Sequence, residues 1–218
     1  MKAFLFDLNG TMIHDMDYHI RAWYHILHAL GSDISMERMK EECYGKNEEL
    51  LERMFPERFS PAEKQAMSFS KEQAYQQSFR PQLQLIAGLD QFLLDANAAG
   101  IALAIGSAAI HFNIDFVLDG LDIRQFFKAI VGAEDVQKSK PDPETYLRCA
   151  ELLNLPVQEC LVWEDSPKGV EAARRAGMQA VVITTLHPVN DFAAFDNIVA
   201  YISDYTNPLL LQQLMKLN

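Results

Sequence analysis

The stretch Phe4–Thr11, with the sequence FLFDLNGT, decides the fold of this chain of 218 residues. Its first three residues are apolar and β-prone, a pattern typical of a buried strand. The run ends at the carboxylate of Asp7, and Gly10 follows as a turn residue. Open α/β sheets bind ligands just beyond the carboxyl ends of their strands, so Asp7 stands where a functional residue is expected. A helix cap or turn role is the alternative for an isolated Asp at a strand end.

Similar apolar segments recur along the chain. The expected strands are Lys2–Phe6, Ile101–Ile105, Ala129–Val131, Cys160–Trp163 and Ala180–Ile183. Helical patterns lie between them, at Gly88–Ala99, Asn113–Leu118, Pro143–Leu153 and Gly169–Ala176. Alternation of strands and helices predicts an α/β fold with a doubly wound parallel sheet. Gly100 and Gly177 each follow a helical run and precede a strand, as expected of helix-terminating glycines.

The segment from Asp15 to Leu83 differs because it has no good strand run. Its apolar residues recur at helical spacing, as in Ile20, Trp23, Tyr24, Leu27 and Leu30. Ser60-Pro61 is typical of a helix start. We therefore expect a helical insertion at residues 15–83 and a core formed by residues 1–14 and 84–218. The tail from Pro208 to Leu217 predicts a short amphipathic helix.

Composition limits the partners. Thirty acidic and 19 basic residues give a formal net charge of −11, which argues against a nucleic-acid or anionic-membrane surface. No run of 18 apolar residues and no signal-peptide pattern is present. Three cysteines without a paired motif predict reduced thiols in a cytoplasmic protein. No obligate protein partner is evident from the sequence.

Three further motifs carry chemical groups at expected strand ends. Ser107 follows the second strand, and its hydroxyl can bond a phosphoryl oxygen, although an N-cap serine is the simpler reading. Lys140 lies in KSKPDP, a string otherwise typical of a solvated loop. Glu164-Asp165 ends another apolar strand and offers oxygen ligands of the kind that Mg²⁺ prefers, or else decorates the surface.

The four motifs, in this order, resemble the haloacid dehalogenase superfamily of aspartyl phosphotransferases, whose first motif is written DxDGT. The resemblance covers about residues 2–205. It is strongest for the β-phosphoglucomutase-like branch, in which a helical cap is inserted between the first two motifs. The resemblance implies a Rossmann-like catalytic core at residues 1–14 and 84–218 and an α-helical cap at residues 15–83.

The resemblance also implies a Mg²⁺-dependent enzyme with an Asp nucleophile. The catalytic residues would be Asp7, Asn9, Ser107 and Lys140. The metal ligands would be Asp7, Asn9 through its carbonyl, Glu164 and Asp165. The substrate-binding residues would be Ser107, Lys140, His19, Lys46 and Lys71. Glu48 stands where the mutase carries an arginine for the sugar phosphate, which weakens a mutase interpretation.

Asn9 departs from the family pattern, which has a second Asp that protonates the leaving oxygen. An amide cannot transfer that proton, and losing a general acid typically costs about 10²–10⁴ in rate. The substrate could be an acyl phosphate or phosphonate that needs no acid, or His14, Asp15 or His19 could supply the proton. Little catalysis is the third alternative, and an engineered Asp-to-Asn replacement would give the same sequence.

The sequence therefore favours a phosphatase-type hydrolase that acts on a small phosphorylated metabolite through an aspartyl-phosphate. The alternative from another class is a phosphometabolite-binding protein with little catalysis. Phosphomutase activity and a phosphonatase type, with Lys46 forming a Schiff base, are further readings within the enzymes.

Overall fold

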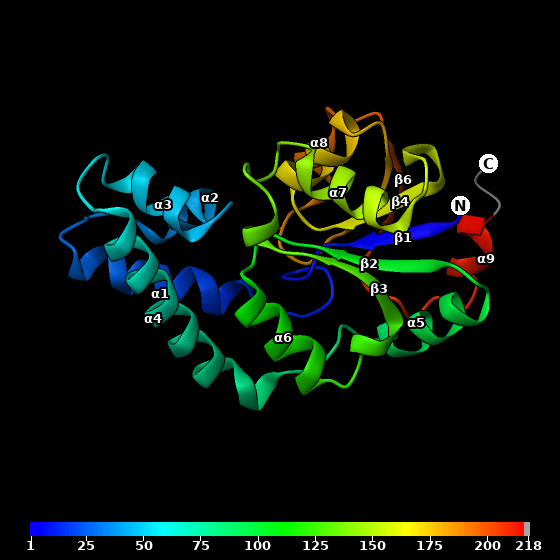
Figure 1. The fold of residues 1–218 in the computed structure, drawn as a ribbon, viewed down its shortest axis with the longest axis horizontal. Helices are drawn as coiled ribbons and strands as arrows, with labels where there is room; N and C mark the ends of the chain where they lie inside the picture. Colours follow the sequence, from blue (N-terminus) through cyan, green and yellow to red (C-terminus); the bar gives the residue numbers. More distant parts are fainter. Residues whose placement is uncertain (216–218) are drawn as a thin grey trace. The chain divides into compact units, whose positions relative to one another are not determined.

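The computed structural model describes residues 1–215 and divides them into two compact units (Figure 1). The first unit contains residues 1–14 and the chain from residue 84 onward, and the second contains residues 15–83. The strands of the first unit are β1 (Ala3–Phe6), β2 (Ala102–Gly106), β3 (Phe127–Val131), β4 (Cys160–Glu164), β5 (Gln179–Ile183) and β6 (Ile198–Ile202). Its α-helices are α5 (Leu89–Ala98), α6 (His111–Gly120), α7 (Glu144–Leu153), α8 (Pro167–Arg175) and α9 (Leu210–Met215).

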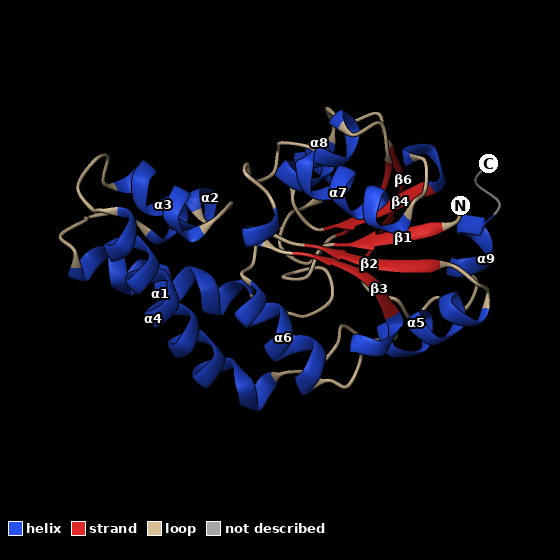
Figure 2. Cartoon of the chain, in the orientation of Figure 1, coloured by secondary structure: helices blue, strands red, loops and turns tan. Residues whose placement is uncertain are grey.

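The six strands form one parallel sheet in the order β3-β2-β1-β4-β5-β6. Figure 2 shows helices on both faces of this sheet, so the expected doubly wound α/β fold is confirmed. The strand β1 lies in the middle of the sheet because it pairs with β2 on one side and β4 on the other. Phe6 is in register with Ile105 and with Trp163, so the residues after these three strands meet at one edge.

Alternate residues of β1 build two separate cores. Ala3 and Leu5 belong to a buried hydrophobic cluster that includes side chains of α7 and α8. On the opposite face, Phe4 stacks on Phe92 of α5 and Phe6 stacks on Trp163 of β4. A strand buried on both faces explains why β1 is a continuous apolar run rather than an alternating one.

The sequence prediction missed β6. This strand lies at the sheet edge, its residues are only half-buried or exposed, and it follows a short 3₁₀ turn, Val189–Phe192, instead of an α-helix. The prediction relied on apolar strands alternating with helices, and within the described residues no α-helix lies between β5 and β6. The predicted tail helix is observed as α9, and Leu217 lies outside the described residues.

The second unit is helical, as expected. It contains α1 (Met16–Ala29), α2 (Met36–Glu42), α3 (Asn47–Met54) and α4 (Pro61–Phe79). The predicted start at Pro61 is confirmed: the Ser60 hydroxyl accepts from the Glu63 amide, and the Glu63 carboxylate accepts from the Ser60 amide. Within the described part of the chain, no helix combines the length and apolar character that a bilayer span requires.

Candidate active site

Three buried carboxylates meet at the carboxyl edge of the sheet. Asp7 follows β1, while Glu164 ends β4 and Asp165 follows it. Each of the three offers an oxygen, and these oxygens all lie within 4.8 Å of one another. The register between β1 and β4 brings residues separated by more than 150 positions into this cluster. The structure thus joins three of the four expected metal ligands.

Lys140 lies between two of these carboxylates. Its Nζ donates to Oδ1 of Asp7 and to Oε1 of Glu164, each at 2.7 Å. Burial lowers the pKa of Lys140, but the charges of Asp7 and Glu164 outweigh that effect and hold the pKa above its ordinary value. Lys140 is therefore a fixed ammonium beside the proposed nucleophile.

Glu164 is held by five hydrogen bonds. Oε1 accepts from Lys140 and from the Tyr146 hydroxyl, and Oε2 accepts from the Asp165 amide and from the amide and hydroxyl of Ser166. A carboxylate has about four lone-pair positions, so these bonds use its acceptor capacity. Burial raises the pKa of Glu164, whereas Lys140 and the hydrogen bonds hold it below the ordinary value. A Cβ at Gly169 would collide with this carboxylate, so glycine leaves the necessary space.

The pKa of Asp165 is shifted in the opposite direction from that of Glu164. Burial, together with the charges of Glu164 and Asp7, raises its pKa well above the ordinary value, and Lys140 only partly offsets them. The Thr11 hydroxyl lies 3.4 Å from its Oδ1, and a Cβ at Gly10, whose φ is +76°, would collide with the carboxylate. Three carboxylates with one ammonium leave an excess of negative charge in a buried place. This donor set fits a hard divalent cation such as Mg²⁺.

Two further motif residues follow strands that end at the same edge of the sheet. Ser107 follows β2, is buried, and accepts the Ala109 amide on its hydroxyl oxygen at 3.1 Å. Asn9 is half-buried in the loop after Asp7. That loop is fixed by side chains from distant parts of the chain, because Thr185 donates to the Gly10 carbonyl and Tyr205 donates to the Thr11 carbonyl.

The second unit has a polar cluster of its own. Lys71 Nζ lies 2.5 Å from His19 Nδ1 and 2.9 Å from Glu72 Oε1. Since an ammonium only donates, Nδ1 accepts, and the ring proton is then on Nε2, which faces Asp15 Oδ2 at 3.2 Å. Asn47 donates to Glu72 at 2.6 Å, and Tyr75 donates to Asp15 at 2.5 Å.

Of the three expected substrate-binding residues in the second unit, His19 and Lys71 are in contact. Lys46 is half-buried just before α3, and its amide donates to Glu49. Sequence reasoning missed Tyr146, Glu72, Asn47 and Tyr75. Only Tyr146 carried a usable signal, since it lies six residues after Lys140 on a helix that must bury one face.

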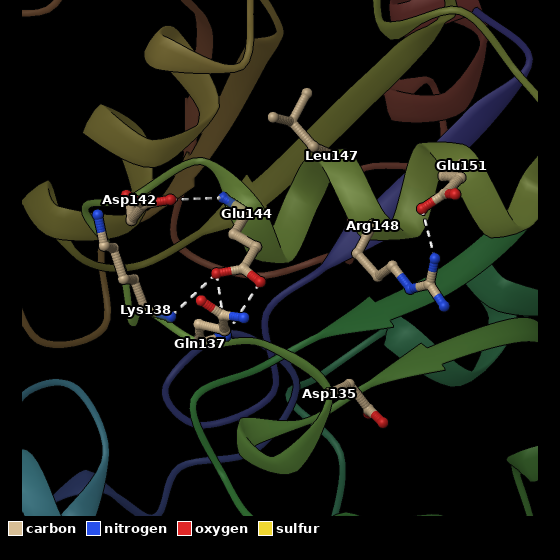
Figure 3. A pocket seen from close by; sticks show the side chains of 8 residues that line it. All are labelled: Asp135, Gln137, Lys138, Asp142, Glu144, Leu147, Arg148 and Glu151. Carbon is tan, nitrogen blue, oxygen red and sulfur yellow. Dashed lines mark hydrogen bonds and ion pairs between the residues drawn. The ribbon is translucent and has the colours of Figure 1, made fainter.

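A surface pocket lies beside the Lys140 loop, on the first unit (Figure 3). It is lined by Asp135, Gln137, Lys138, Asp142, Glu144, Leu147, Arg148 and Glu151. Figure 3 shows the Glu144 carboxylate directed at the backbone of Gln137 and Lys138, and both amides donate to it at 2.9–3.0 Å. Four carboxylates against two basic side chains disfavour a phosphate here. The pocket wall instead fixes the loop that carries Lys140.

Comparison with known proteins agrees with this geometry. The family model described as haloacid dehalogenase-like hydrolase matches residues 4–183. β-Phosphoglucomutase of Bacillus subtilis is 32% identical over 223 residues, covering 98% of this chain and 95% of that protein. Fructose-1-phosphate phosphatase of Escherichia coli is 25% identical over 182 residues, covering 84% and 96%.

A solved structure gives the same result. β-Phosphoglucomutase from Clostridium difficile has a TM-score of 0.84 and 26% identity, covering 98% of this chain and 96% of that one. The family model alone spans more than half of the sequence. The chain therefore belongs to the haloacid dehalogenase-like hydrolases and, within them, to the β-phosphoglucomutase-like branch.

Proposed function

We propose that this protein is a Mg²⁺-dependent hydrolase that removes the phosphoryl group from a small phosphorylated metabolite through an aspartyl-phosphate on Asp7. The observation that carries the proposal is the buried ammonium of Lys140 between Asp7 and Glu164, with Asp165 alongside. A purely structural cluster would gain little from three buried carboxylates and one cation, because unpaired buried charge is costly.

In this mechanism a carboxylate oxygen of Asp7 forms a bond to phosphorus while the bond from phosphorus to the leaving oxygen breaks. The leaving oxygen takes a proton from His14, Asp15 or His19, or departs as an anion where the substrate is an acyl phosphate. Water then attacks the aspartyl-phosphate, which releases inorganic phosphate and restores the Asp7 carboxylate. Lys140 offsets charge on the phosphoryl oxygens, and the hydroxyl of Ser107 donates to one of them. Fixed donors of this kind need no rearrangement at the moment of reaction.

The cation would be held by Asp7, Asp165 and the backbone carbonyl of Asn9. When bound, Mg²⁺ supplies positive charge that offsets the charge of the phosphoryl oxygens. Glu164 is adjacent, and its five hydrogen bonds favour a role in orienting Lys140 and the Asp165 backbone over direct coordination.

We propose further that residues 15–83 act as a cap that selects the substrate, with His19, Lys46 and Lys71 as its contacts. The names of the relatives support a phosphorylated sugar of modest size, since one is a β-phosphoglucomutase and another a fructose-1-phosphate phosphatase.

Asn9 favours a second candidate, a phosphometabolite-binding protein with little turnover. The carboxamide cannot supply the proton, while its backbone carbonyl remains available to a metal. Phosphomutase or phosphonatase-type activity would need the same Asp7 and Lys140, so those two residues do not separate these chemistries.

The test is a panel of sugar, sugar-alcohol, acyl and aryl phosphates assayed with Mg²⁺, using the wild type and Asp7→Ala. Phosphate release that depends on both Mg²⁺ and Asp7 supports the hydrolase. Tight binding of beryllium trifluoride with Mg²⁺ and no release from any substrate would support the binding protein. Full activity of Asp7→Ala would overturn the mechanism.

A further inference from the structure

Tyr146 lies fully buried in the first turn of α7, against two groups on which the proposed reaction depends. Its hydroxyl donates to Oε1 of Glu164 at 2.8 Å. Its ring centroid lies 4.7 Å from Nζ of Lys140. One side chain thus contacts both the ammonium and the carboxylate that holds it.

Gly106 allows the first turn of α7 to lie close to the end of β2. A Cβ at Gly106, at the end of β2, would lie 3.1–3.2 Å from side-chain atoms of Thr145, Tyr146 and Cys149. Such contacts are tighter than normal packing, so only glycine lets the first turn of α7 lie this near the sheet without adjustment. The phenol reaches Glu164 because α7 packs at this distance.

The two donors at Oε1 of Glu164 act together. Lys140 donates at 2.7 Å and Tyr146 at 2.8 Å, so the carboxylate oxygen is fixed from two directions. The ring face attracts the ammonium as well, by a cation–π interaction. Without the hydroxyl, Glu164 would draw more strongly on Lys140, and the ammonium would move away from Asp7.

We propose that Tyr146 is a positioning residue for the phosphoryl-transfer reaction: it holds Glu164 so that Lys140 stays shared with Asp7. The inference rests on the proposed function, because it assigns value to the Lys140–Asp7 contact. Tyr146 therefore acts through Glu164 and Lys140, the two groups that it contacts.

The test is Tyr146→Phe, which removes the hydroxyl and keeps the ring. Beryllium trifluoride affinity in the presence of Mg²⁺ is measured by calorimetry, and kcat and KM are measured on a substrate from the panel. Removing an outer partner of such a site typically costs about 10–100-fold, so we expect losses of this size in kcat and in fluoride-complex affinity, with KM little changed. Wild-type values in both measurements would overturn the proposal.

Cys149→Ala is the matched control. Cys149 is buried one turn later on α7 and bonds the Ile105 carbonyl instead of the site. It should leave both measurements unchanged. Equal losses in Cys149→Ala and Tyr146→Phe would mean that helix packing, rather than the hydroxyl, is responsible, and would overturn the proposal.

A double-mutant cycle separates positioning from general stability. In a Lys140→Met background, Tyr146→Phe should cause no further loss of fluoride-complex affinity per folded molecule, because the group it positions is gone. An additive loss would overturn the proposal. Asp7→Ala is measured in the same series: unchanged affinity there would contradict the proposed function itself, whereas a loss in Asp7→Ala without a loss in Tyr146→Phe would contradict only the role of Tyr146.

Discussion

Each unit of the protein buries a lysine against carboxylates, and the two arrangements differ. Lys140 is 7% exposed and Lys71 is 2% exposed. Lys140 is shared by Asp7 and Glu164, which come from two neighbouring strands. Lys71 pairs with Glu72, the next residue of α4, and with His19 of α1. The first arrangement gathers charge from distant parts of the chain, and the second balances charge locally.

The carboxylates beside the two lysines have opposite pKa shifts. Burial raises the pKa of Glu72, but the charge of Lys71 and the hydrogen bond from Asn47 lower it to about 2. Burial and two neighbouring carboxylates raise the pKa of Asp165 well above its ordinary value. Glu72 is therefore held ionised by side chains of its own unit, while the carboxylates of the first unit still favour an added cation. Under the proposed function, the first cluster carries the phosphoryl-transfer chemistry, while the second joins α1 to α4 and places His19 and Lys71 for contact with the substrate.

The largest expected effect comes from replacing each of the two buried lysines in turn. Lys140→Met should lower kcat by about 10²–10³, the usual cost of removing one fixed donor to developing charge. Lys71→Met should mainly lower stability, because it leaves the buried Glu72 carboxylate uncompensated, at a cost of about 3–5 kcal/mol. Phosphate release and urea unfolding, measured on both variants, provide the check. An equal fall in kcat for Lys71→Met would make Lys71 part of the chemistry and end the contrast.

Acid stability tests the balance in the second unit. The pKa of Glu72 is about 2 in the folded protein, and its ordinary value is 4.5. The contribution of its ionised form to the free energy of unfolding is therefore complete above pH 4.5 and is lost as the pH falls toward 2. This gap corresponds to about 3 kcal/mol. Urea unfolding is measured from pH 6 to pH 3. The free energy of unfolding of the wild type should exceed that of Glu72→Gln at pH 6, and this difference should shrink as the pH falls.

The control for that experiment is Glu41→Gln, since Glu41 is an exposed acid on α2 in the same unit. Its free energy of unfolding relative to the wild type, measured over the same pH range, is the reference for the change seen in Glu72→Gln. A constant gap between Glu72→Gln and the wild type across this range would mean that Glu72 is not held ionised by Lys71.

The contrast between a cluster at strand ends and a cluster between helices also explains which site residues the sequence could predict. Asp7, Glu164 and Asp165 were predictable because each follows or ends an apolar strand, and parallel strands bring their carboxyl ends together. The role of Lys140, which lies in a loop, was implied only by the resemblance of its motif to the family. The contacts of Tyr146, Glu72 and Asn47 depend on how each helix is rotated about its axis. Apolar spacing does not give that rotation precisely, since Lys71 and Glu72 are adjacent and both are buried. The sequence thus predicted which residues lie at the strand ends, but it did not predict which side chains of neighbouring helices contact one another.

Asn9 provides the next test, since the side chains that could replace its missing proton donor, His14, Asp15 and His19, are divided between the two units. Asn9→Asp should raise phosphate release from alkyl phosphates by about 10²-fold, the usual worth of a general acid. The gain should be small for acyl or aryl phosphates, whose leaving groups need no protonation. Affinity for Mg²⁺ with beryllium trifluoride serves as the control and should change little. Equal rates for Asn9→Asp and the wild type would point to His14, Asp15 or His19 as the donor.

The smallest expected effect decides whether Asp15 is such a donor. Asp15 is buried, and the Tyr75 hydroxyl donates to its Oδ2 at 2.5 Å, with His19 Nε2 at 3.2 Å from the same oxygen. A carboxylate held in place by two partners on different helices suits a scaffold better than a proton donor that must reach the leaving group. Tyr75→Phe should therefore destabilise the protein by about 2 kcal/mol, the worth of a hydrogen bond to a charged group, and leave kcat unchanged. Thermal unfolding and kcat on an alkyl phosphate check this. A shift in kcat that Asn9→Asp removes would show that Asp15 substitutes for the missing acid, and the second unit would then share in the chemistry that we assign to the first.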